Sequence, residues 1–237
     1  MSQLSVPRTI LGVLGGLGPA ASAEFLRLLA VMAPAGRDQE HPVTYVYSNP
    51  QIPDRSAAVL GIGPSPEPFL RDGLETLVSW GAGLLAVPCN TAHIFIDRFR
   101  DKLKVPLVHI VEATVERAME TDDSGAWLLA TEGTVQSGLY QSVAREQGYE
   151  LRFPPDEAVQ AISRSISLVK AGDVKAAAVL LAPVIQELWS SADLPVIGAC
   201  TELPLAYAVS SLPSAGMISS LEALAGKCVQ ELYGCRG

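Results

Sequence analysis

Ala86-Val87-Pro88-Cys89-Asn90-Thr91-Ala92-His93 is the stretch that decides the fold of this chain. The apolar run 83–87 predicts a buried parallel strand, and residues 92–100 have the apolar spacing of a helix. Cys89 thus lies where a strand ends and a helix begins. Ligands bind at this edge of open α/β sheets, and the helix dipole there favours a thiolate. Taken alone, the stretch is equally compatible with a small, buried structural cysteine.

A second stretch repeats this order of features. Leu194-Pro195-Val196-Ile197-Gly198-Ala199-Cys200-Thr201-Glu202-Leu203-Pro204 contains an apolar strand, a cysteine and a helix-forming run. The first strand and glycine turn, 10–19, likewise have a counterpart at 127–134. We interpret the chain as a duplicated α/β half, with one cysteine at the mouth of a strand in each half. Two such halves facing each other would hold one small molecule between two thiols.

The repeat predicts an α/β fold of two pseudo-symmetric, open parallel-sheet (flavodoxin-like) domains, with the active site in the cleft between them. The first half is expected to contain residues 1–112 and 210–237, and the second residues 113–209. A helix over 219–233 is expected to return and pack on the first half. The chain has 237 residues, of which 49% are hydrophobic, which is enough for two cores of this size.

Charge and composition restrict the classes of partner. The net charge is −8, and no basic cluster is present, so we expect no binding to nucleic acid. No apolar run is long enough to span a bilayer, and residues 1–9 lack the pattern of a signal peptide. A cytoplasmic protein is therefore expected, in which the cysteines stay reduced. These are Cys89, Cys200, Cys228 and Cys235, of which the last two are expected to be packing residues.

Two loops at predicted strand ends carry candidate binding groups. The first glycine turn does not have the dinucleotide-binding spacing, and its amides at Gly16 and Leu17 suit a small anion or a carboxylate. The second strand, 43–48, ends in a polar loop whose candidates are Asn49, Gln51 and Arg55. The planar guanidinium of Arg55 matches a carboxylate, although an ordinary surface pair with Asp54 is the alternative.

Two opposed cysteines permit two-base proton transfer at one carbon atom. One thiolate removes a proton from one face while the other thiol donates a proton to the opposite face, which inverts the centre. Donors must then converge on the substrate carboxylate to stabilise the carbanion. The candidates for these donors are Asn90, Thr91, Thr131 and Thr134, together with the glycine-turn amides.

Three other chemistries are compatible with these residue types. A zinc site could use Cys89, His93 and Cys200, but no C-x-x-C pair or second nearby histidine supports it. A cysteine–histidine hydrolase would leave the mirrored second cysteine unexplained. A regulatory disulfide between the two thiols is disfavoured in a reducing compartment.

The motifs together resemble the aspartate/glutamate racemase superfamily, and most closely its aspartate racemase branch. The resemblance runs from Leu11 to about Leu205. It is carried by Leu14-Gly15-Gly16-Leu17-Gly18-Pro19, Ile52-Pro53-Asp54-Arg55, Pro88-Cys89-Asn90-Thr91-Ala92-His93, Ala130-Thr131-Glu132-Gly133-Thr134 and Cys200-Thr201-Glu202-Leu203-Pro204. It implies racemisation by Cys89 and Cys200 without pyridoxal phosphate or a metal, in a protein that is commonly a homodimer.

The resemblance also assigns roles to two cationic residues. Arg55 and Lys170 match positions that aspartate racemases use for the side-chain carboxylate, although spacing alone indicates that Lys170 is an ordinary residue at a helix C-terminus. Glutamate racemases carry Cys-Thr-His at the second cysteine, where this chain has Cys200-Thr201-Glu202. That difference favours the aspartate branch. Among the departures from the family pattern, Ser219-Ser220-Leu221 has no role that we can derive from the sequence.

We therefore expect a racemase of L- and D-aspartate. The alternatives are a racemase of glutamate or other amino acids, a one-thiol decarboxylase or isomerase, and a non-catalytic binder of small dicarboxylates. Thr201 and Glu202 are expected at the substrate site. Glu202 has two interpretations of equal weight. It either caps a helix, or it binds the substrate ammonium or shares the proton of Cys200.

Overall fold

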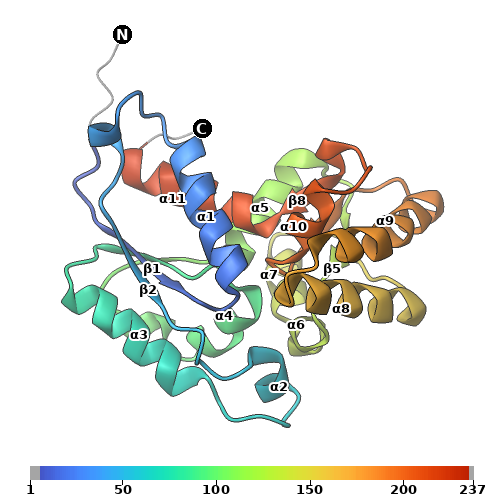
Figure 1. Ribbon diagram of the computed structural model, residues 1–237, viewed down its shortest axis with the longest axis horizontal. Helices are drawn as coiled ribbons and strands as arrows, with labels where there is room; N and C mark the ends of the chain where they lie inside the picture. The colour runs from blue at the N-terminus through green and yellow to red at the C-terminus, as the bar shows by residue number, and fades with distance from the viewer. Residues whose placement is uncertain (1–5, 235–237) are drawn as a thin grey trace.

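Two four-stranded parallel sheets form the framework of the computed structural model, which describes residues 6–234 (Figure 1). The first sheet has the order β2-β1-β3-β4 and the second the order β6-β5-β7-β8. The strands of the first are β1 (Leu11–Gly15), β2 (Thr44–Ser48), β3 (Leu84–Ala86) and β4 (Leu107–Val108). Those of the second are β5 (Ala126–Leu129), β6 (Leu151–Arg152), β7 (Val196–Gly198) and β8 (Met217–Ser219). The identical orders confirm the expected pair of pseudo-symmetric α/β halves.

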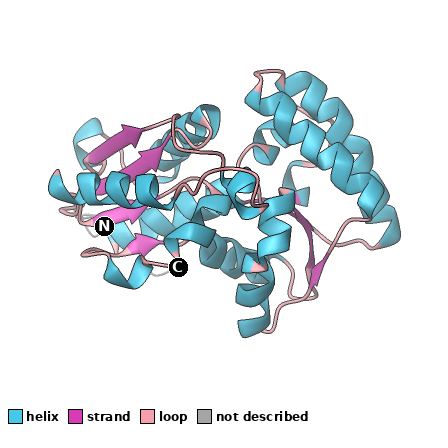
Figure 2. Cartoon of the chain, turned by 90° about the horizontal axis from the view of Figure 1, so that it is seen from below, coloured by secondary structure: helices cyan, strands magenta, loops and turns pink. Residues whose placement is uncertain are grey.

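Helices cover both sheets and occupy the junction between them. The longer ones are α1 (Pro19–Met32), α3 (Glu67–Ser79), α5 (Ile110–Thr121), α8 (Asp156–Lys170), α9 (Val174–Ser191) and α11 (Ser220–Tyr233). The shorter ones are α2 (Arg55–Val59), α4 (Asn90–Ile96), α6 (Glu132–Ser137), α7 (Leu139–Glu146) and α10 (Leu203–Ala208). Single 3-10 turns lie at Asp38–Glu40, Arg100–Lys102 and Ser214–Gly216. Seen from below, the strands separate into two groups with helices around each (Figure 2).

Alternation along the strands divides the apolar side chains among three cores. In β1, Leu11 and Val13 face a core that both halves share, whereas Leu14 faces an outer core under α3 and α4. In β5, Leu128 faces the shared core, whereas Leu129 faces a second outer core under α8, α9 and α10. The shared core gives the two halves a common apolar interior.

The halves exchange one helix each. Helix α5 follows β4 of the first sheet but packs against α7 and β8 of the second half. Helix α11 follows β8 of the second sheet but packs against α1 and β4 of the first half, as expected for the C-terminal helix. Residues 217–219, which we grouped with the first half, form β8 beside β7 of the second sheet. The boundaries of the two halves after residues 112 and 209 otherwise stay a prediction.

One of the two remaining cysteines is a packing residue of the shared core. Cys228 is fully buried there, as expected, whereas Cys235 lies outside the described residues. Within residues 6–234, none of the helices combines the length and apolar composition needed to cross a membrane.

Candidate active site

A small cavity lies where the carboxyl ends of β1, β3, β5 and β7 meet. Its volume is about 20 Å³, which is room for about one water molecule. Ten of the fourteen site residues predicted from sequence line it: Leu17, Arg55, Cys89, Asn90, Thr91, Thr131, Lys170, Cys200, Thr201 and Glu202. Asp54 and Ser56, which the prediction did not include, complete the lining. Both cysteines therefore reach one cavity from opposite halves of the fold.

The structure places the other four predicted residues outside the cavity lining. The N–H of Gly16 donates to the hydroxyl of Ser22 at 2.9 Å, so this amide is already occupied. Asn49 accepts the N–H of Gln51 at 3.1 Å and thereby closes its own turn. Thr134 is fully buried behind Thr131, to which it is hydrogen-bonded. Their substrate contacts stay predictions that need these groups to rearrange.

Cys89 is the residue that precedes α4, where the chain is still extended. Its side chain is 7% exposed. The helix begins at Asn90, so Cys89 lies at the opening turn that the sequence predicted. The helix ends at Ile96, earlier than the predicted residue 100, and a separate 3-10 turn follows at Arg100–Lys102.

Cys200 lies beside a carboxylate. Its thiol donates to Oε2 of Glu202 at 3.0 Å, and the Thr201 hydroxyl donates to the same oxygen at 3.3 Å. Burial first, and then the charge and hydrogen bond of Glu202, hold the pKa of the Cys200 thiol well above its usual value, while Lys170 acts in the opposite direction. Cys200 is therefore held as the protonated thiol.

Glu202 does not cap the helix that follows it. It occupies the position before α10, but its side chain makes no capping hydrogen bond there. Its carboxylate is only 3% exposed, and Oε1 has no hydrogen-bond partner among residues 6–234. This oxygen packs against Gly18, where an added Cβ would lie 2.3 Å away. The geometry thus removes the capping interpretation and leaves a carboxylate that faces Cys200.

The two halves reach across to each other in the same way. Thr91, two residues after Cys89, bonds the hydroxyl of Thr134 at 2.9 Å in the first turn of α6, the helix that follows β5. Glu202, two residues after Cys200, packs on Gly18 in the turn after β1. The residue two positions after each cysteine therefore contacts the opposite half. On one side this contact is made within a cluster of hydroxyl groups, and on the other by a carboxylate.

Arg55 is held rigidly at the start of α2. Its Nη atoms donate to the carbonyl groups of Ile52, Pro53 and Leu17 at 3.1–3.2 Å. Its Nε–H is buried without a partner among residues 6–234 and is thus free to meet a ligand. The alternative pairing with Asp54 is wrong, because Asp54 caps α2 by accepting the N–H of Ala57 at 2.8 Å.

Lys170 is the last residue of α8, as predicted, and its exposed side chain also lines the cavity. A cation thus lies on each side of the cavity, Arg55 from the first half and Lys170 from the second.

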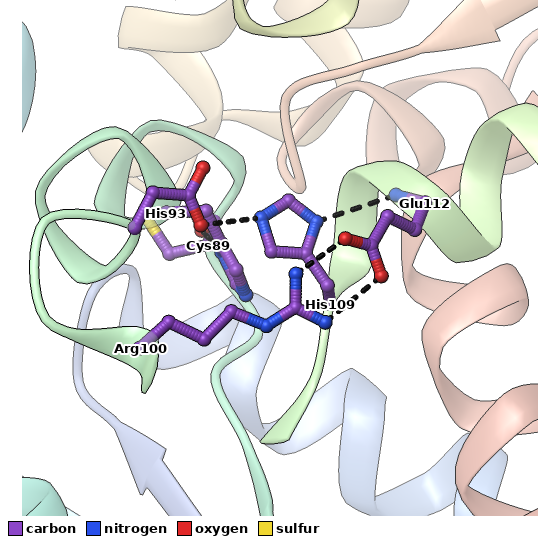
Figure 3. Close-up of polar contacts among 6 residues, drawn as sticks. Cys89, His93, Arg100, His109 and Glu112 are labelled. Atoms are coloured by element: carbon purple, nitrogen blue, oxygen red, sulfur yellow. Dashed lines mark hydrogen bonds and ion pairs between the residues drawn. The ribbon is translucent and has the colours of Figure 1, made fainter. Parts of the chain in front are cut away.

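His93 serves the backbone rather than the thiol. Its ring is fully buried, and Nδ1 donates to the carbonyl of Cys89 at 2.9 Å. Burial lowers the pKa of His93 well below its usual value, so the imidazole is neutral. The ring contacts that of His109 edge-to-face, at 4.5 Å between centroids, and Figure 3 draws both histidines together with Cys89. This placement gives no support to a hydrolase in which His93 activates Cys89.

The second ring of this pair belongs to a polar cluster that fixes the start of α5. His109 bonds the Asp97 carboxylate through Nε2 at 3.1 Å and accepts the N–H of Glu112 through Nδ1. Arg100 forks onto Glu112, as Figure 3 also shows. No group of three or more His, Cys, Asp or Glu side chains in residues 6–234 is arranged to hold a metal ion, so the geometry offers no support for the zinc alternative.

Helix α2 covers the cavity from the first half and contacts α6 of the second. Gly133 of α6 lies so close to Ser56 of α2 that an added Cβ would be 3.1 Å from its Cα. An amino acid has several times the volume of this small cavity, so its lining residues must move apart for one to enter, and the contact between α2 and α6 is one place where this can happen. Helix α2 is not predictable from the sequence, because a helix of five residues is too short to show a periodic pattern.

Comparisons with known proteins point to one family. The model of the Asp/Glu/Hydantoin racemase family matches residues 14–228. An aspartate racemase from Picrophilus torridus has a similar structure, with 30% identity, a TM-score of 0.81, and 96% of this chain and 95% of that one covered. An aspartate racemase homologue from Pyrococcus horikoshii shares the fold at 23% identity and a TM-score of 0.73, covering 96% and 100% of the two chains. The broad specificity amino-acid racemase RacX of Bacillus subtilis is 29% identical over 200 residues, which are 81% of this chain and 85% of that protein.

Proposed function

The chain belongs to the Asp/Glu/hydantoin racemase family and is thus an isomerase, and we propose that it interconverts L- and D-aspartate by proton transfer between Cys89 and Cys200. One observation carries this proposal: both thiols line one small cavity together with Arg55 and Lys170. The cations supply the charge that a dicarboxylate requires, and the thiols supply an acid and a base.

The reaction needs one thiolate and one thiol at a time. The thiolate of Cys89 removes the α-proton from one face, and the electron pair of the broken C–H bond passes into the α-carboxylate. The thiol of Cys200 then donates its proton to the opposite face, so that a new C–H bond forms with inverted configuration. Cys89 ends as the thiol and Cys200 as the thiolate, ready for the reverse direction.

The hydrogen bond from Cys200 to Glu202 supports this starting assignment. A thiol held protonated beside a carboxylate is an acid at rest, which leaves Cys89 as the base. After transfer, the Cys200 thiolate lies next to the Glu202 carboxylate, and the positive charge of Lys170 offsets part of that repulsion. Glu202 can also receive the substrate ammonium through its unpartnered Oε1.

Substrate choice rests on the cations. The free Nε–H of Arg55 and the ammonium of Lys170 fit the side-chain carboxylate of aspartate. A racemase with a broader range is the second candidate, because the Bacillus subtilis relative is named for broad specificity. The expected homodimer stays a prediction.

The test is chiral chromatography of L-aspartate incubated with the purified protein, without added pyridoxal phosphate and in the presence of a chelator. We expect Cys89→Ser and Cys200→Ser each to abolish racemisation, since a serine hydroxyl is a far poorer base at neutral pH. Cys228→Ala, which changes a cysteine outside the cavity, is the matched control and should keep its activity per folded molecule.

Solvent deuterium separates the two roles, because a single variant can still exchange the α-proton on one face. Glutamate and alanine, assayed in parallel, measure the breadth of substrate. Full racemisation by either serine variant would refute the two-thiol mechanism. Binding of aspartate without any racemisation would leave a dicarboxylate-binding protein.

A further inference from the structure

Three buried hydrogen bonds connect the two cysteine loops beneath the cavity. The hydroxyl of Tyr140 donates to Oδ1 of Asn90 at 2.7 Å. Nδ2 of Asn90 donates to the hydroxyl oxygen of Ser220 at 2.9 Å. The hydroxyl of Ser220 in turn donates to the carbonyl of Gly198 at 2.8 Å. We call this series of hydrogen bonds the Tyr140–Asn90–Ser220–Gly198 clasp.

The clasp spans the whole architecture. Asn90 follows Cys89 at the start of α4, and Gly198 ends β7 two residues before Cys200. Tyr140 comes from α7 and Ser220 from the first turn of α11. Tyr140 and Ser220 are both fully buried, and Asn90 is 2% exposed, so water does not compete for these hydrogen bonds.

The direction of each hydrogen bond is determined. Ser220 has one hydroxyl hydrogen, which it gives to a carbonyl, so it can only accept from Asn90. The Asn90 amide is therefore oriented with its NH₂ group toward Ser220 and its oxygen toward the Tyr140 hydroxyl. Burial raises the pKa of Tyr140, so its hydroxyl stays a donor. Asn90 also lines the cavity, and its NH₂ group carries a second hydrogen.

We propose that Tyr140 and Ser220 are positioning residues. They orient the Asn90 amide so that it presents an N–H to the substrate carboxylate, and they hold the Cys89 loop at a fixed distance from the strand that precedes Cys200. The proposal rests on the proposed function. Two-base transfer needs both sulfur atoms correctly placed about one carbon, and a misplacement of about 1 Å costs about a hundredfold in rate. Substrate entry can proceed at α2 and α6 while the clasp stays closed below.

The test compares Tyr140→Phe and Ser220→Ala with two neighbouring variants. We expect each clasp variant to lose about ten- to a hundredfold in kcat/KM for both enantiomers, per folded molecule. Tyr149→Phe controls for the loss of a buried tyrosine hydroxyl, and Ser219→Ala removes the helix cap next to Ser220. Both controls should keep kcat/KM near that of the wild type, even where the melting temperature changes. If Ser220→Ala fails to fold, Tyr140→Phe alone decides the outcome.

A second set of variants separates positioning from a structural role. In an Asn90→Ala background, Tyr140→Phe should cause no further loss of kcat/KM, because it acts through Asn90. An equal loss in that background, or wild-type kcat/KM in the clasp variants, would overturn the proposal.

The side-chain amide signal of Asn90 in a ¹⁵N–¹H spectrum gives a readout that needs no activity. We expect one of its two hydrogens to exchange slowly with solvent in the wild type, and faster in Tyr140→Phe. A wild type that racemises no amino acid would refute the proposed function. Rapid exchange of both amide hydrogens would refute the clasp itself.

Discussion

A methyl group at Gly18 should disable the site without unfolding the protein. The backbone at Gly18 is extended, with φ 169°, so alanine can adopt it without strain. The Cβ of that alanine would lie 2.3 Å from Oε1 of Glu202 and 3.4 Å from Cδ. The nearest obstacle is the end of a side chain, and this end can move. The backbone can therefore stay in place while the carboxylate is displaced.

The size of the displacement sets the size of the effect. Nonbonded heavy atoms pack at roughly 3.5 Å, so Oε1 must retreat by roughly 1 Å. The 3.0 Å hydrogen bond from Cys200 to Oε2 of Glu202 cannot survive such a shift unchanged. A misplacement of about 1 Å in a catalytic group costs about a hundredfold. We thus expect kcat/KM to fall by about a hundredfold in Gly18→Ala, with a melting temperature within a few degrees of the wild type (about 1 kcal/mol corresponds to a few degrees).

The assay is racemisation of L- and D-aspartate, measured separately, alongside thermal unfolding. Gly36→Ala is the matched control, because a Cβ there would meet only Oε2 of Glu40 at 3.6 Å, an ordinary contact. It should leave both quantities near the wild type. If Gly18→Ala retains its kcat/KM and its pH profile, the contact between Gly18 and Glu202 does not position the carboxylate, and the argument from this contact is wrong.

Three further predictions concern single groups. Arg55→Ala should lower kcat/KM for aspartate by an amount equivalent to about 1.5–3 kcal/mol, and kcat/KM for alanine far less, because a charge-assisted hydrogen bond to the side-chain carboxylate is lost. Equal losses for the two substrates, measured by chiral chromatography, would mean that Arg55 binds the α-carboxylate or only supports its loop. Glu202→Gln removes a charge that raises the pKa of Cys200, and this pKa should therefore fall. The limb of the rate–pH profile that reports Cys200 ionisation should move to lower pH, and kcat should be roughly 10- to 150-fold lower. An unmoved limb would contradict this assignment. Tyr149→Phe deletes a buried hydroxyl without a partner among residues 6–234 and should raise the free energy of unfolding by about 1 kcal/mol in urea denaturation, whereas a decrease would reveal a hidden partner.

The sequence predicted the parts of the site that local patterns determine. A strand, a cysteine and a helix start follow one another within a few residues, so the order of residues alone places Cys89 and Cys200 at strand ends. The duplication of that pattern placed them in facing halves, and the fold expected from it is confirmed. The family that the motifs resemble is confirmed as well. Arg55 and Lys170 line the cavity as well. Arg55 was already a candidate from its loop at a strand end, whereas only the resemblance to a family singled out Lys170.

Contacts between distant segments could not be predicted in this way. Ser220 lies 130 residues from Asn90 in the chain, and a serine at a helix start has an ordinary capping explanation. The three residues of β8 are too few to show a strand period. Gly16 was expected to bind a ligand, but its N–H is taken by Ser22 from one turn into α1. Each of these features depends on which segments meet in space.

The crossings at Thr91 and Glu202 make the two faces of the cavity unequal, although racemisation itself is symmetric. Thr91 bonds neutral hydroxyls, whereas Glu202 holds a proton on Cys200. The equilibrium constant between enantiomers in an achiral solvent is one, so kcat/KM must be the same in both directions whatever the site contains. The asymmetry of the site can therefore change kcat and KM of the two enantiomers only by the same factor, so that their ratio stays common to both. In the proposed two-thiol mechanism, Cys200 is the acid in the resting form. The enantiomer that reacts with this form is therefore expected to show the lower KM together with the lower kcat, because its complex starts from the more stable protonation state.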